Sequence, residues 1–95
     1  MSTIDIHAKH EMSYEQAQDA ADKLSADLAS KFGIDYGWDG DDIHFERPGV
    51  HGQIRVDGEA IHVQAHLGFM LALMKTPIED EIRRYLGEEF GCTFS

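Results

Sequence analysis

Apolar and polar positions alternate in several short stretches of the chain, with the period of two that marks a half-buried β-strand. The first such stretch is about residues 3–9. Three more follow near residues 43–47, 50–56 and 61–67, separated by Pro48-Gly49 and by Asp57-Gly58-Glu59. Both separators have the composition of tight turns, so the three stretches predict a three-stranded antiparallel meander.

A shorter alternation covers Ile34, Tyr36 and Trp38 and stops at Asp39-Gly40-Asp41. Asp and Gly favour turns, and the segment lacks the further spaced acidic positions of a calcium loop. We therefore expect a hairpin turn there. Because Tyr36 and Trp38 share the alternation of Ile34, we expect both rings to pack in the core rather than to stack on a ligand.

Helical spacing first appears after Ser13-Tyr14-Glu15-Gln16, which has the form of a capping box. In such a box the Ser13 hydroxyl accepts from the amide of Gln16, whose side chain reaches back to the start of the helix. Gly33 sits where a helix commonly ends, which predicts a helix over about residues 14–32. Its apolar stripe is Ala17, Ala20, Ala21, Leu24, Leu28 and Phe32.

A second helix is predicted to begin at Thr76-Pro77-Ile78-Glu79, another capping-box pattern with proline at the first helical position. We expect Thr76 to cap this helix and Gly87 to end it. The stripe between them is Ile78, Ile82, Tyr85 and Leu86.

The predicted order of elements is β-α-β-β-β-α within one domain, residues 1–95. One face of the sheet is apolar and must be covered, so we expect an α+β two-layer sandwich. Its mainly antiparallel sheet has about four strands, with both helices on one face. The first strand either joins the sheet through a right-handed crossover beside the second strand or pairs with the last strand.

Matching apolar faces across each turn fixes the register of the meander. Val56 then lies opposite Ile61, and Phe45 lies over Gly52. Three polar rows follow on the other face, and His7 points to the same side. The rows are Asp42–Arg55–His62, His44–Gln53–Gln64 and Glu46–His51–His66.

The histidine-rich face suggests a metal site or a small enzyme as an alternative function. His62 and His66 are four strand residues apart, about 13 Å, which is too far to share one ion. Glu46, His51 and His66 can supply a carboxylate and two imidazoles from one patch. We nevertheless favour ordinary polar cross-strand pairs, because an open face offers no cleft for a tuned acid or base. No catalytic motif is recognisable, and no cofactor is expected.

One segment of the chain has no polar face at all, whichever way it folds. It contains Leu67, Phe69, Met70, Leu71, Leu73 and Met74. A small domain already fills its core with two helical stripes and one sheet face, so part of this segment is expected at the surface as a partner-binding patch. The alternative is that the whole segment folds over the open end of the sheet and is buried.

The composition of the chain limits the classes of partner that it can bind. The chain has 18 Asp and Glu against 8 Lys and Arg, a net charge of -10, which would repel nucleic acid and anionic membranes. Cys92 is the single cysteine, so an internal disulfide is impossible, and its acidic surroundings predict an unreactive thiol. The start of the chain lacks a signal-peptide pattern, and residues 67–74 are too short to span a membrane. We expect a cytoplasmic protein.

The order of elements resembles that of one family, the small bacterial polyhydroxyalkanoic acid system proteins. The resemblance rests on the turn Arg47-Pro48-Gly49-Val50-His51-Gly52, on the Leu67-Gly68 junction, and on the closing segment Pro77-Ile78-Glu79-Asp80-Glu81-Ile82. It implies an intracellular protein connected with polyhydroxyalkanoate granules and supplies no catalytic residues. Long amphipathic helices of the granule coat proteins, the phasins, are absent from this sequence.

Three functions follow from these observations. The first is a non-enzymatic accessory protein that binds a hydrophobic partner, either the polyester surface, a granule protein or a second copy of itself. The second is a metal-dependent protein or enzyme that uses the histidine face. The third is a purely structural homodimer.

Overall fold

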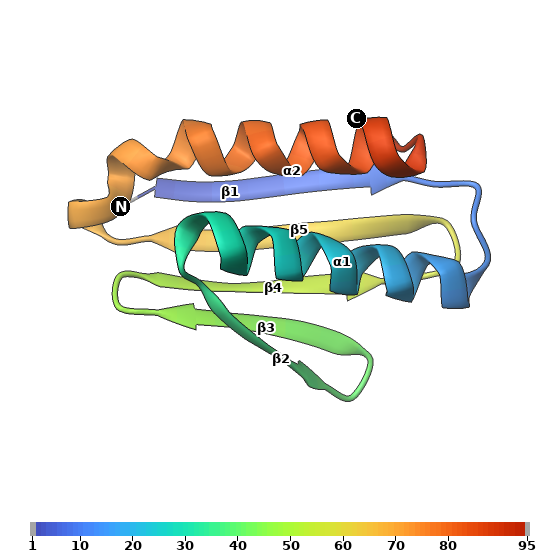
Figure 1. The fold of residues 1–95 in the computed structure, drawn as a ribbon, viewed down its shortest axis with the longest axis horizontal. Coiled ribbons are helices and arrows are strands. Elements are labelled where there is room, and N and C mark those ends of the chain that lie inside the picture. The colour runs from blue at the N-terminus through green and yellow to red at the C-terminus, as the bar shows by residue number, and fades with distance from the viewer. Residues whose placement is uncertain (1, 95) are drawn as a thin grey trace.

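The computed structural model describes residues 2–94, and its elements confirm the α+β class. Two helices run along the strands on one side of an antiparallel sheet (Figure 1). In chain order the elements are β1 (Ser2–Lys9), α1 (Tyr14–Phe32), β2 (Asp35–Asp39), β3 (Asp42–Arg47), β4 (Val50–Val56), β5 (Ala60–Leu67), the 3₁₀-helix η1 (Phe69–Met74), α2 (Lys75–Phe90) and β6 (Thr93–Phe94).

The sheet has six strands in the order β2-β3-β4-β5-β1-β6, rather than the four expected. The additional strands are β2, which pairs with β3 across the Asp39–Asp42 turn, and the two-residue β6, which pairs with the end of β1. β1 pairs antiparallel with β5, so of the two placements left open by the sequence, pairing with the last meander strand is correct.

The predicted register of the meander is confirmed. Val56 lies opposite Ile61, and Phe45 lies opposite Gly52. A Cβ added to Gly52 would lie 2.7 Å from the carbonyl oxygen of Gln64, so only glycine lets β4 and β5 approach this closely. Gly49 has a φ of 88°, and since Pro48 holds a negative φ, the β3–β4 turn is type II.

The core lies between the two helices and the apolar face of the sheet. Small residues on α1 let it approach the strands closely, and Ala17, Ala20 and Ala21 have no exposed surface. From α2, Ile78, Ile82 and Leu86 are buried against β1 and α1. Burial of these apolar side chains is the main source of stability in a domain of this size.

The start of α1 follows the sequence prediction, whereas both predicted ends of α2 are wrong. Ser13 Oγ accepts from the Gln16 amide at 3.1 Å, and Gln16 Oε1 accepts from the Ser13 amide at 3.1 Å. Thr76 does not cap α2, because η1 leads straight into α2 and the chain is already helical at Lys75. Gly87 stays within α2, which ends at Gly91 with a φ of 65°.

The prediction that Tyr36 and Trp38 pack in the core is also wrong. Both rings are on the helix side of the sheet, opposite Phe45 and Ile43, but β2 is an edge strand with β3 as its neighbour in the sheet. Tyr36 is 36% exposed and Trp38 is 41% exposed. The Trp38 indole instead donates a hydrogen bond to Asp22 Oδ1 on α1 at 3.0 Å.

Candidate functional site

The apolar segment after β5 is partly core and partly surface, so each of the two sequence alternatives holds for different side chains. Leu67, the last residue of β5, is completely buried. Leu71 and Met74 are partly buried and pack against the core. The remaining large side chains of η1 are exposed to a degree unusual for apolar residues: Phe69 is 84%, Met70 is 85% and Leu73 is 92% exposed.

The geometry of η1 explains this division. In a 3₁₀-helix, side chains three residues apart lie on one line along the axis. Leu71 and Met74 therefore share the side that faces the core, while Met70 and Leu73 share a side that faces away. Phe69 lies at the start of η1, next to the second pair. We call Phe69, Met70 and Leu73 the apolar tip.

The base of η1 is fixed to the rest of the protein. The Gly68 amide donates to the Gly49 carbonyl in the β3–β4 turn at 2.7 Å, and the Leu71 amide donates to the Gly68 carbonyl at 3.0 Å. A Cβ added to Gly49 would lie 3.0 Å from Leu71 Cδ1, so the turn and η1 are in close contact. The apolar tip is consequently held outward on a supported base.

The apolar tip belongs to a stretch of the sequence without acidic residues. No Asp or Glu occurs between Glu59 and Glu79, in a chain with 18 of them. The nearest charge along the chain is Lys75, at the start of α2. Desolvation of the tip against an apolar surface would therefore bury no carboxylate of this segment.

The cross-strand rows of the histidine face are arranged as predicted, and their side chains lie on the open surface of the sheet. His51 lies opposite both Glu46 and His66, and all three are exposed. The contact that the structure gives for His66 is with Thr3, at 3.4 Å from Oγ1 to Nδ1. Within residues 2–94 no group of three or more His, Cys, Asp or Glu side chains is arranged to hold a metal ion.

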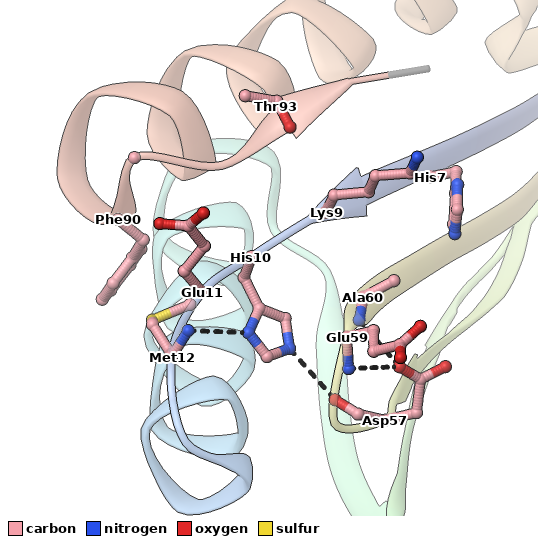
Figure 2. A pocket seen from close by; sticks show the side chains of 11 residues that line it. His7, Lys9, His10, Glu11, Met12, Asp57, Glu59, Ala60, Phe90 and Thr93 are labelled. Atoms are coloured by element: carbon pink, nitrogen blue, oxygen red, sulfur yellow. Dashed lines mark hydrogen bonds between the residues drawn. The ribbon is translucent and has the colours of Figure 1, made fainter.

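A polar hollow at the other end of the molecule was missed by the sequence analysis. It has a volume of about 810 Å³ and lies among the end of β1, the β4–β5 turn and the end of α2 (Figure 2). His10, only 8% exposed, lies in its lining and uses both ring nitrogens: Nδ1 accepts from the Met12 amide and Nε2 donates to the Asp57 carbonyl, both at 3.0 Å. The sequence signal was His10 on the apolar side of the first strand's alternation.

At two further places in the fold, side chains have shifted pKa values. Between the helices, burial raises the pKa of Asp27, and the Arg84 guanidinium lowers the pKa of Glu81 to about 2. Glu81 accepts from Lys31 at 2.7 Å and from Arg84 at 2.7 Å, so this cluster joins α1 to α2. Burial also raises the pKa of the Cys92 thiol, which agrees with the expectation of an unreactive cysteine.

Comparisons with known proteins give one result. No curated protein and no solved structure matches the chain. Among residues 2–94, no helix is long and apolar enough to cross a membrane. The family model described as "Putative polyhydroxyalkanoic acid system protein" matches residues 4–90. The match covers nearly all of the 95 residues and agrees with the resemblance seen in the sequence, and the chain belongs to this family.

Proposed function

We propose that this protein is a non-enzymatic accessory protein of the polyhydroxyalkanoate system that binds a hydrophobic partner, the granule surface or a granule protein, through its apolar tip. The observation that carries the proposal is the exposure of Phe69, Met70 and Leu73 at 84%, 85% and 92%. Monomeric proteins seldom leave neighbouring large apolar side chains in water without a binding role. The family supplies the setting, because storage polyester is an apolar surface within the cell.

The form of the tip favours the polyester surface over a flat protein interface. Its side chains project from a supported 3₁₀-helix, and an amorphous apolar phase can close around projecting groups of any shape. Met70 adds a flexible side chain that adapts to irregular surfaces. A cytoplasmic location at the granule follows from this proposal.

The test is sedimentation of the purified protein with polyester particles. Single substitutions Phe69→Ser, Met70→Ser and Leu73→Ser each remove a large apolar side chain, worth roughly 1.5–3 kcal/mol when fully buried. Each should weaken particle binding by about tenfold or more. Because these side chains are almost fully exposed, the fold should be retained, as circular dichroism and the unfolding midpoint will show.

Tyr14→Ser is the matched control. Tyr14 is also an exposed aromatic residue, 39% accessible, but it lies at the start of α1 and away from η1. Its replacement should leave particle binding unchanged. Equal particle binding by wild-type protein and by all three tip variants would contradict the proposal.

A further inference from the structure

One edge of the sheet is formed by β2, which pairs with β3 on one side and, within residues 2–94, with no strand on the other (Figure 1). All five residues of β2 are exposed. A two-residue turn joins β2 to β3, and Asp39 and Asp42, which close it, begin the alternation of hydrogen-bonded and non-hydrogen-bonded pairs. Tyr36 and Trp38 occupy the alternate positions, whose amides and carbonyls point away from β3. This edge can therefore take a further strand.

The open face of this edge, which is the side away from the helices, brings like charges together. Asp35 lies opposite Glu46, and Asp39 lies opposite Asp42. Like charges directly opposite each other destabilise a sheet. Arg55 offsets the second pair, with its Nε 3.8 Å from Asp42 Oδ2. Asp35 and Glu46 make no ion pair with any Lys, Arg or His of residues 2–94, so a basic partner would relieve their repulsion.

Gly37 leaves room on the open face between the two aspartates of β2. It lies between Asp35 and Asp39 along the strand and opposite His44, and a Cβ added to it would meet no atom within 4 Å. A hollow of about 520 Å³ lies here, and Asp35, Asp39 and Glu46 are among its lining residues. His44 Nε2 is 3.6 Å from Asp39 Oδ2, a long contact between exposed groups that is weak in water. The hollow can hold a long basic side chain between carboxylates.

We propose that the free edge of β2 binds an extended segment of a basic partner protein, in which Lys or Arg alternates with apolar residues. The segment adds to the sheet as an antiparallel strand, like every strand pair already present. Its apolar residues lie opposite Tyr36 and Trp38 on the helix side. Its basic residues lie opposite Asp35, Gly37 and Asp39 on the open face. Backbone hydrogen bonds give such an added strand its affinity, and the alternating side chains give it specificity.

The charges favour a basic partner over a second copy of this chain. If all five residues of β2 paired antiparallel with β2 of another copy, each Asp35 would lie opposite an Asp39, which is unfavourable. On the helix side, Asp19 and Asp22 line a hollow beside the same edge and add to its negative charge. The chain cannot supply the proposed strand from elsewhere, because no two of its 8 Lys and Arg residues are two positions apart.

The experiment is a titration of the full chain, in low salt at pH 7.5, with a capped pentapeptide in which three arginines alternate with two valines. Trp38 is the single tryptophan and is 41% exposed on β2, so its fluorescence reports an added strand directly. Binding should shift the emission to shorter wavelength and saturate at one peptide per chain. The same peptide with both valine amides methylated keeps its charge but loses the backbone donors that face β2. Its Kd should be higher by about tenfold or more.

Three variants separate this edge from the rest of the molecule. Asp35→Asn/Glu46→Gln removes the repelling carboxylates and should raise the Kd of the peptide about tenfold. Glu15→Gln/Glu89→Gln removes the same charge from exposed positions on the helices and should bind like wild type. Leu73→Ser, in the apolar tip, should also bind like wild type, so failure of this proposal is distinguishable from failure of particle binding. Unchanged Trp38 emission, equal Kd for the methylated peptide, or equal weakening by both charge variants would each overturn the proposal.

Discussion

The two ends of the molecule treat buried and exposed groups in opposite ways. The long axis measures 37 Å, with η1 at one end and the end of β1 and the β4–β5 turn at the other (Figure 1). The polar hollow lies beside that end of β1 and that turn. At the hollow, a buried polar ring has partners for both of its nitrogens, since His10 contacts Met12 and Asp57. At η1, large apolar side chains face water. The exposure of these side chains thus follows from where the fold places them and not from their polarity.

The largest expected effect on the free energy of unfolding distinguishes the two sides of η1. Leu71→Glu places a charge against the core, and we expect it to lower the free energy of unfolding by about 2–4 kcal/mol. Met70→Glu, on the neighbouring residue, should change it by less than about 0.5 kcal/mol, because Met70 is 85% exposed. Urea denaturation measures the free energy of unfolding of both variants. Equal losses would mean that Met70 is as buried as Leu71, contrary to the structure.

The next effect belongs to the polar end. His10→Ala leaves the Met12 amide and the Asp57 carbonyl without their partner, so the free energy of unfolding should fall by about 2 kcal/mol. His66→Ala is the matched control, an exposed histidine on the open sheet face, with an expected change within about 0.5 kcal/mol. Thermal unfolding that fails to separate these variants would show that His10 does not anchor the β4–β5 turn.

The two helix starts sharpen the contrast between the ends. Ser13 caps α1 beside the polar hollow, and Ser13→Ala should cost about 1 kcal/mol. Thr76 makes no cap in α2, since the chain arrives there from η1, so Thr76→Ala should be neutral within about 0.5 kcal/mol. Chemical denaturation of both variants checks this, and equal losses would restore the capping box at Thr76.

The smallest expected effect on stability is between the two ends of the molecule, where α1 contacts α2. The folded-state pKa of Asp27 is raised, so its ionised form costs stability above that pKa, and the cost disappears as pH falls through it. Asp27→Asn should therefore raise stability slightly at pH 7, with an advantage that shrinks toward pH 4. The stability due to Glu81, whose pKa is lowered, is lost from about pH 4.5 downward in both proteins.

Local patterns in the sequence predicted the three strands of the meander and their pairing. Pro48-Gly49 and Asp57-Gly58-Glu59 each allow one short turn, and a shift of one residue would have moved Ile54 off the apolar face. The capping box at Ser13 is equally local. Such features depend on residues within a few positions of each other, which a sequence shows directly.

What the sequence did not predict depends on neighbours that are distant along the chain. Trp38 alternates correctly, but alternation gives the side of the sheet and not whether a helix covers it. His10 binds Asp57, 47 residues away. The division of η1 required knowing that the segment forms a 3₁₀-helix, because other conformations would have turned different side chains outward.

The hydrogen bond from Gly68 to Gly49 has a consequence for how the protein opens. It joins the entrance of η1 to a turn 19 residues earlier, so neither segment can move far while the bond lasts. The Gly68 amide proton should consequently exchange with solvent deuterium only when the β3–β4 turn and η1 separate. Its exchange rate then reports the opening of both segments as one cooperative unit, measured at a single backbone position.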